Sequence, residues 1–170
     1  MITPVNFDEY APQVLKQLQR EGAFLTVQSG DKLNTMTIGW GTIGYIWRLP
    51  VFTVLVRHNR YTHQLIQNAD NFTVSVPLNK DLKSQLAFCG SKSGRDIDKF
   101  SACNISPQPA QITATPVIAE CALHYECSII YTQSMEQEYL NPEVLNSCYR
   151  QQPPLHTFYY GKILASYLNG

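Results

Sequence analysis

Residues 23–40 read Ala23-Phe24-Leu25-Thr26-Val27-Gln28-Ser29-Gly30-Asp31-Lys32-Leu33-Asn34-Thr35-Met36-Thr37-Ile38-Gly39-Trp40. Two runs rich in β-branched and apolar residues flank Ser29-Gly30-Asp31-Lys32, whose residue types favour a tight turn. The stretch therefore predicts a β-hairpin. It is followed by a Gly- and aromatic-rich segment, expected to be a loop over residues 41–50, and by an almost continuously apolar strand over residues 51–56.

The rest of the chain adds strands with helices inserted between them. Residues 117–131 alternate, with Leu123 and Tyr125 on one face of the expected strand and His124 and Glu126 on the other. The order of elements lacks regular βαβ alternation, so it favours a mainly β fold, a Greek-key-like antiparallel barrel with short helices. Helices are expected over residues 8–20, 61–68, 80–88 (ended by Gly90) and 142–149, further strands over residues 72–76 and 156–167, and irregular structure over residues 90–116.

Length and composition limit the class of protein. The chain has 170 residues, which at about 100–200 residues per domain corresponds to a single domain over residues 1–170. Charged residues make up only 15%, against a usual share of about 25%. A chain with few charged residues has uncharged surface that a second subunit can cover, and the segment from Trp40 to Trp47 is rich in aromatic residues. We therefore expect a homodimer.

The same features exclude several partners and locations. The net charge of +0 argues against a general nucleic-acid binder. No run approaches about 18 apolar residues, so no membrane span is expected, and the N-terminal residues lack a secretory pattern. The five cysteines contain no CxxC pair, which fits reduced thiols and a cytoplasmic protein. The four histidines have no metal-ligand spacing with them, so no metal site is expected.

One motif matches a dinucleotide-binding fingerprint by letters alone. Gly39-Trp40-Gly41-Thr42-Ile43-Gly44 fits G-x-G-x-x-G. However, Pro50 would stop the helix that should follow, and no acidic residue occurs between Asp31 and Asp70 to bind ribose hydroxyls. A glycine-rich loop that lets the backbone approach a neighbour closely is the better interpretation.

One segment of the chain has no acidic residues, which indicates that it binds an anion. Residues 32–69 contain Lys32, Arg48, Arg57 and Arg60 and no Asp or Glu, so a neutral chain concentrates positive charge here. In Arg57-His58-Asn59-Arg60-Tyr61-Thr62, two arginines and a hydroxyl stand at the start of a short expected helix. This arrangement suits a phosphate monoester, although a solvated basic turn is an equally good interpretation.

Two further segments carry polar groups suited to a flat heterocycle. Asn34-Thr35-Met36-Thr37 offers donors and acceptors next to the flat side chain of Trp40, as a planar ring with polar edges requires; an ordinary threonine-rich strand remains the alternative. The segment from Cys89 to Lys99 is polar and glycine-punctuated and carries Lys92 and Arg95. It could equally be a mobile surface loop.

Five segments in one order resemble the flavin reductase-like family, with its FMN-binding split barrel, and the flavoredoxin branch in particular. Each segment is a weak signal alone, but their order is specific, and together they extend from Gly22 to Tyr167. The segments are Asn34-Thr35-Met36-Thr37-Ile38-Gly39-Trp40-Gly41, Trp47 before Pro50, Arg57-x-x-Arg60-Tyr61-Thr62, Ser93-Gly94-Arg95-Asp96-x-Asp98-Lys99-Phe100 and His156-x-x-Tyr159-x-Gly161-x-Ile163.

The resemblance implies an oxidoreductase that holds FMN without a covalent bond, usually at a dimer interface, and that accepts hydride from NADH or NADPH. Asn34, Thr35, Met36 and Thr37 would then line the flavin ring and ribityl chain, and Trp40 would pack near the ring. The phosphate would be held by Arg57, Arg60, Tyr61 and Thr62, with Lys99 approaching the flavin from the following loop.

No acid or base is assigned a catalytic role, because the cofactor supplies the hard chemistry; for His156 a structural role is favoured. Two other functions stay open. The protein could be a flavoredoxin-like electron carrier without nicotinamide turnover, or a barrel that binds a ligand without flavin. The electron acceptor is not indicated by the sequence.

Overall fold

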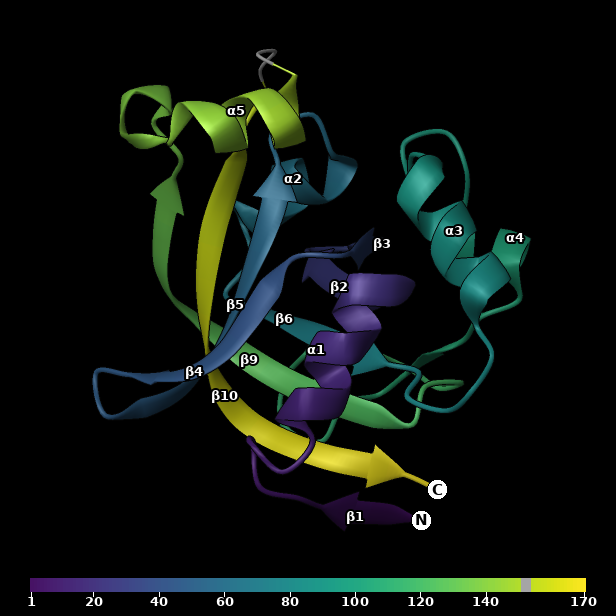
Figure 1. Cartoon of the computed structure of the whole chain (residues 1–170). Coiled ribbons are helices and arrows are strands. Elements are labelled where there is room, and N and C mark those ends of the chain that lie inside the picture. The colour runs from purple at the N-terminus through teal and green to yellow at the C-terminus, as the bar shows by residue number, and fades with distance from the viewer. Residues whose placement is uncertain (151–153) are drawn as a thin grey trace.

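The computed structural model describes residues 1–150 and 154–170. It is built on one antiparallel eight-stranded sheet in the order β3-β2-β6-β9-β10-β5-β4, to which β1 adds by pairing with β10. The sheet curls into a barrel (Figure 1), and in the described residues no ladder joins β3 to β4, so the barrel is split at that seam. The strands are β1 (Ile2–Pro4), β2 (Ala23–Ser29), β3 (Lys32–Ile38), β4 (Gly41–Ile46), β5 (Leu49–Arg57), β6 (Asn71–Val76), β9 (Leu123–Ser134) and β10 (His156–Asn169), with β7 (Pro107–Gln108) and β8 (Val117–Ile118) forming a separate pair.

Short helices cover the barrel, as the sequence predicted. In Figure 1, α5 lies over the end of the barrel near α2, whereas α3 and α4 lie together beyond β2 and β3. α1 closes the core by burying Val14 and Leu18 among the apolar side chains of the sheet. The helices are α1 (Ala11–Arg20), α2 (Tyr61–Ile66), α3 (Lys83–Ser91), α4 (Lys99–Cys103) and α5 (Pro142–Tyr149), with a short 3-10 turn at Gln137–Tyr139.

The hairpin over residues 23–40 is confirmed. β2 and β3 pair antiparallel from Ala23↔Ile38 to Ser29↔Lys32. Gly30 in the turn has φ +60°, a conformation that glycine adopts without steric cost.

The expected loop over residues 41–50 is wrong, because β4 and the start of β5 form a second hairpin there. Its turn consists of Trp47 and Arg48, with φ values of 55° and 61°. Of the tight two-residue hairpin turns, type I′ requires positive φ at both central residues, which is why Asn-Gly and Asp-Gly usually mark it. Trp47-Arg48 has neither residue type, so the usual signal for this hairpin is missing.

The segment from residue 80 to residue 116 also differs from expectation. The helix begins at Lys83, and Gly90 lies inside it rather than ending it. A Cβ at Gly90 would lie 3.3 Å from Thr37 Cβ, so glycine lets α3 pack closely against β3. The region expected to be irregular contains α4 and β7.

The first five residues of β9, 123–127, are buried on both faces, although their sequence alternates. His124 and Glu126 are as inaccessible as Leu123 and Tyr125. The carboxylate of Glu126 accepts hydrogen bonds from the backbone N–H groups of Gln111, Ile112 and Thr113 at 2.7, 2.8 and 2.8 Å. The polar face of the strand is therefore covered by this loop rather than by solvent.

The described residues hold no helix with the length and apolar character needed to cross a membrane. The same residues hold no cluster of three or more His, Cys, Asp or Glu side chains arranged for a metal ion.

Candidate functional site

Two adjoining cavities open on the end of the barrel near α2 and α5. The first, here called the cationic cavity, has a volume of about 160 Å³, and the second, here called the Trp40 cavity, about 250 Å³. Met36, Arg57 and Arg60 line both, so the two cavities share a wall. The cationic cavity is lined by Asn34, Met36, Arg57, Asn59, Arg60, Tyr61, Thr62, Ser91, Lys92, Ser93, Gly94, Arg95 and Lys99, and the Trp40 cavity by Met36, Thr37, Ile38, Gly39, Trp40, Leu55, Arg57, Arg60, Cys148 and His156.

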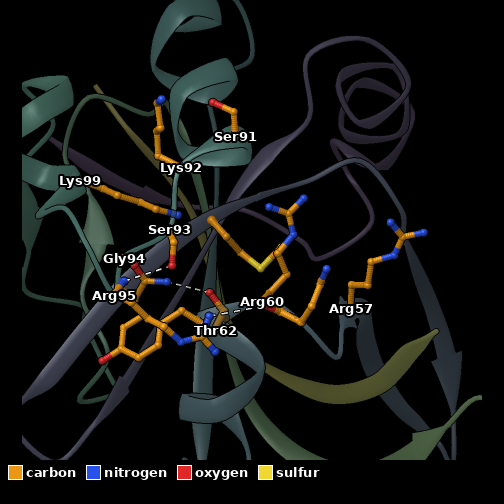
Figure 2. Close-up of a pocket in the computed structure, with 13 residues that line it drawn as sticks. Arg57, Arg60, Thr62, Ser91, Lys92, Ser93, Gly94, Arg95 and Lys99 are labelled. Atoms are coloured by element: carbon orange, nitrogen blue, oxygen red, sulfur yellow. Dashed lines mark hydrogen bonds between the residues drawn. The ribbon is translucent and has the colours of Figure 1, made fainter. Parts of the chain in front are cut away.

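Positive charge dominates the cationic cavity. Arg57 comes from the end of β5, Arg60 from the residue before α2, and Lys99 from the start of α4 (Figure 2). Lys92 and Arg95 add two more cations, and none of the described residues that line this cavity is acidic. A chain of net charge +0 thus places uncompensated positive charge in one hollow, which favours an anionic ligand.

Backbone carbonyls, which carry no formal charge, hold two of these cations. Arg60 Nη1 donates a 2.7 Å hydrogen bond to the carbonyl of Gly90. The Lys99 ammonium, 3% exposed, donates to the carbonyls of Thr35 at 2.9 Å and Cys89 at 2.8 Å. Burial lowers the pKa of Lys99, and burial followed by the charge of Arg57 lowers that of Arg60. Both effects express the cost of holding positive charge here without a counter-ion.

Aromatic rings orient the other two arginines. The Arg57 guanidinium lies 5.2 Å from the centre of the Tyr149 ring, and that of Arg95 lies 5.3 Å from the centre of Tyr61. Such cation–π contacts restrain a guanidinium without neutralising it. Arg57 Nε is buried and has no hydrogen-bond partner among the residues that the structure describes, so within this part of the chain a donor at the wall shared by the two cavities is unsatisfied.

The Trp40 cavity combines a flat aromatic side chain with polar groups, among them Arg57, Arg60 and His156. Trp40 is 44% exposed, and its ring lies 5.0 Å from His156 and 6.1 Å from Tyr149 between centres. The Tyr149 hydroxyl lies 2.6 Å from His156 Nδ1. Burial, followed by the charges of Arg57, His58 and Arg60, lowers the pKa of His156 to about 4, so this imidazole is neutral at neutral pH.

The structure brings together nine of the ten residues that the sequence proposed for the site. Asn34, Met36, Arg57, Arg60, Tyr61, Thr62 and Lys99 line the cationic cavity, and Met36, Thr37, Trp40, Arg57 and Arg60 line the Trp40 cavity. Thr35 lines neither. Its hydroxyl donates to Leu25 O at 3.3 Å and accepts from Thr26 Oγ1 at 3.1 Å, so the side chain faces the neighbouring strand β2. Side chains alternate along β3, so Asn34 and Met36 point to the opposite face from Thr35. Thr37 shares the face of Thr35 but lies near the end of the strand, where it lines the Trp40 cavity.

Sequence reasoning missed the contribution of α5. Cys148 lines the Trp40 cavity, and Tyr149 holds His156 and Arg57 beside it. No local motif marks these residues, because they reach the site only through the packing of α5 on β5 and β10. The charge of loop 91–95 is visible in the sequence, and the structure places Ser93, Gly94 and Arg95 on the cavity wall.

The geometry suits a ligand with an anionic group and a flat ring. The cationic cavity can take a phosphate, since guanidinium and ammonium donors converge there. The Trp40 cavity offers an aromatic face and an uncharged imidazole, which suit a planar heterocycle.

Comparisons with known proteins agree with this fold. Residues 16–170 match the family described as flavin reductase like domain. An uncharacterized protein of Archaeoglobus fulgidus is 28% identical over 117 residues, which cover 69% of this chain but only 65% of that relative's length.

Among solved structures, the flavoredoxin of Desulfovibrio vulgaris (Miyazaki F) has a TM-score of 0.67 at 21% identity, covering 86% of this chain and 68% of the other. An FMN-binding domain of a flavin reductases-like enzyme from Shewanella baltica OS155 has a TM-score of 0.68 at 18% identity, covering 99% and 77%. At these identities the two structures establish the split-barrel fold. Because the family match spans most of the sequence, the chain belongs to the flavin reductase-like family.

Proposed function

We propose that the protein is an FMN-binding oxidoreductase that holds the FMN phosphate in the cationic cavity and the isoalloxazine ring in the Trp40 cavity. The observation that carries this proposal is the pairing of the two cavities across Arg57 and Arg60. One hollow is cationic and lined by no described acidic residue, and the adjoining one is flat and aromatic. FMN has the same two parts joined by a short chain.

Three features of the site fit the phosphate. Arg60 and Lys99 are held by neutral carbonyls, so their charge remains available. Arg57 Nε is a buried donor that has no partner within residues 1–150 and 154–170. Gly94 leaves space on the cavity wall, because a Cβ there would collide with the side chain of Asn34. Loop 91–95 can therefore lie close to the bound group.

On the ring side, Trp40 provides an apolar face and His156 a polar group that carries no charge at neutral pH. When bound, FMN would supply the hydride and electron transfer. The chain contributes position and electrostatics. The positive charge of Arg57 and Arg60 favours a ring that carries negative charge.

A nicotinamide is the proposed electron donor. The family resemblance supports it, and so does the 44% exposure of Trp40, which leaves the Trp40 cavity open to a second flat ring. The competing function is that of an electron carrier, and the fold similarity to a flavoredoxin supports it. Stopped-flow mixing of the FMN-loaded protein with NADH or NADPH decides between them. Rapid bleaching of the flavin absorbance supports the reductase, and no bleaching supports the carrier.

The first experiment is titration of the purified protein with FMN and riboflavin. Tight FMN binding, with much weaker riboflavin binding, is expected because only FMN carries the phosphate. Absence of FMN binding would reject the proposed function and favour a barrel that binds some other anion.

We further propose that the protein is a homodimer. Trp47 at the tip of the second hairpin is 57% exposed and lies 5.9 Å from Tyr131 and 6.0 Å from Tyr160 between ring centres. An exposed aromatic cluster of this kind is typical of an interface. Sedimentation at micromolar concentration should give twice the 19.3 kDa chain mass; a monomer with FMN bound would exclude the dimer.

A further inference from the structure

His156 in the Trp40 cavity is held on both sides by aromatic rings. Its ring centre lies 5.0 Å from that of Trp40, tilted by 44°, and 5.4 Å from that of Tyr149 in an edge-on arrangement at 72°. Tyr149 is buried at the end of α5, whereas His156 begins β10. Tyr149 from α5, the element directly before β10, and Trp40, which lies between β3 and β4, therefore fix the orientation of one imidazole from two sides.

The short contact between Tyr149 and His156 also determines where the imidazole proton lies. The Tyr149 hydroxyl lies 2.6 Å from His156 Nδ1 and 3.3 Å from the sulfur of Met135. In the alternative arrangement Nδ1–H would donate to the hydroxyl, which would donate to the sulfur, but 2.6 Å is shorter than the separation of about 2.7–3.2 Å that an N–H donor gives. The hydroxyl has one proton to donate, and an imidazole nitrogen is a far better acceptor than a thioether. The hydroxyl therefore donates to Nδ1, which must be unprotonated in the neutral ring, so the proton of the ring is on Nε2.

The surroundings keep the imidazole neutral. Arg57 lies opposite His156 in the antiparallel register of β5 and β10, and Arg60 lines the same cavity as His156. His58 is the residue directly after β5, and its Nε2 forms a 2.9 Å hydrogen bond with Thr157 Oγ1. Together with burial these charges lower the pKa of His156 to about 4. Burial raises the pKa of Tyr149, so its hydroxyl keeps its proton.

We propose that Tyr149 is a positioning residue, which holds His156 in the Nε2-protonated tautomer and thereby presents an uncharged N–H donor to the ligand of the Trp40 cavity. The ligand class is a planar heterocycle with carbonyl or ring-nitrogen acceptors at its edge. This inference rests on the proposed function for the identity of the ligand. The tautomer itself belongs to the protein alone and can be measured without any ligand.

The first test is ¹⁵N NMR of the histidine rings in the ligand-free protein, with the His156 signals assigned from His156→Gln. Wild type should show a protonated Nε2 and an unprotonated Nδ1. Tyr149→Phe should mix the two tautomers, whereas Tyr139→Phe, which alters an exposed tyrosine, should change nothing. A protonated Nδ1 in wild type, or an unchanged tautomer in Tyr149→Phe, overturns the proposal.

The second test measures riboflavin affinity, which reports the ring side without the phosphate. Tyr149→Phe and His156→Ala should each weaken riboflavin by about three- to tenfold, the effect of one net hydrogen bond. His156→Gln should retain most of the affinity, because its amide also offers an N–H donor. In the His156→Ala background, Tyr149→Phe should have no further effect, since its action passes through the imidazole.

Equal losses from Tyr149→Phe in both backgrounds would show that Tyr149 acts on the fold instead, and would overturn the positioning role. If wild type binds neither FMN nor riboflavin, the proposed function fails, while the NMR result still decides whether Tyr149 sets the tautomer. The failures of the two proposals are thus distinguishable.

Discussion

The side-chain amide of Asn34 donates a 2.8 Å hydrogen bond to the hydroxyl oxygen of Thr62. Both side chains are buried, so this bond joins β3 to the first turn of α2 beneath the cationic cavity. The amide oxygen of Asn34 then faces Gly94 on the opposite loop. One asparagine thus sets the distance between the strand, the helix and the loop that surround the cavity.

This arrangement makes Gly94 sensitive to substitution. In Gly94→Ala, the new Cβ would collide with Asn34 Oδ1 and approach Tyr61 Cδ1 to 3.1 Å, so loop 91–95 must move outward. We expect FMN binding to weaken by about 1–3 kcal/mol, the usual cost of overpacking, as measured by calorimetric titration. Gly44→Ala is the control, because a Cβ at Gly44 meets nothing within 4 Å. Equal affinities for wild type and Gly94→Ala would place the ligand elsewhere.

Arg60→Ala tests the phosphate assignment. Loss of a hydrogen bond to a charged group should weaken FMN by about 1.5–3 kcal/mol, while riboflavin binding should hardly change. Arg48→Ala removes an exposed arginine at the tip of the second hairpin and should affect neither ligand. Equal losses for FMN and riboflavin would mean that Arg60 supports the fold or the ring rather than the phosphate.

Lys99→Met should reduce stability as well as binding. The substitution leaves the carbonyls of Thr35 and Cys89 without their donor, and a buried unsatisfied group costs about 1–3 kcal/mol. Urea unfolding should therefore show a lower free energy of unfolding for Lys99→Met than for Lys92→Met, which alters an exposed lysine of the same loop. Identical unfolding curves would show that the Lys99 ammonium is solvated.

The same variant reports on the redox balance of bound FMN. Lys99 and Asn34 line the cationic cavity and not the Trp40 cavity, so with the ring in the Trp40 cavity Lys99→Met and Asn34→Ala should both leave the midpoint potential close to that of wild type. A fall of tens of millivolts in Lys99→Met, where about 30 mV corresponds to 1.4 kcal/mol for a two-electron couple, would place the ammonium beside the ring instead. Spectroelectrochemical titration of both variants beside wild type measures the difference.

Glu126 should make stability fall in acid. Burial tends to raise the pKa of Glu126, but the N–H groups of Thr113, Gln111 and Ile112 outweigh it, and the pKa lies below its ordinary value. A carboxyl with a depressed folded-state pKa stabilises the fold above its unfolded pKa of about 4.3, and this stabilisation is lost as the pH falls through the folded pKa. The free energy of unfolding measured from pH 7 to pH 3 should decline less steeply in Glu126→Gln than in wild type. Glu136→Gln, at an exposed position, should follow wild type.

Local signals in the sequence predicted the elements that depend on local chemistry. The helix at residues 142–149 matches α5 at both ends, because Asn141 caps it by accepting from the N–H of Glu143 at 2.8 Å and Pro142 occupies its first position. Gly30 is the local signal that marks the turn between β2 and β3. The hairpin of β4 and β5 has no such marker, since Trp47 and Arg48 adopt positive φ without glycine or asparagine.

The candidate site likewise contains residues that local sequence signals predict and residues that they do not. Arg57, Arg60 and Thr62 are close in sequence, so their grouping could be predicted from the chain. Tyr149 and His156 flank a connection that carries no motif, and their contact depends on how α5 packs against β10. The burial of Lys99 likewise depends on carbonyls from β3 and α3, which no pattern around Lys99 reveals.

β10 has a consequence for the order of folding. It pairs with β1, β5 and β9 at once, and its register sets His156 opposite Arg57, 99 positions earlier in the chain. Pairings between such distant segments close slowly, on the order of milliseconds to seconds in all-β domains. The Trp40 cavity, which His156 lines, is therefore complete only when this strand docks, whereas no described residue that lines the cationic cavity lies on β10. Ligand binding would then serve as a kinetic reporter of the completed barrel, because collapsed intermediates that lack β10 hold only half of the pocket.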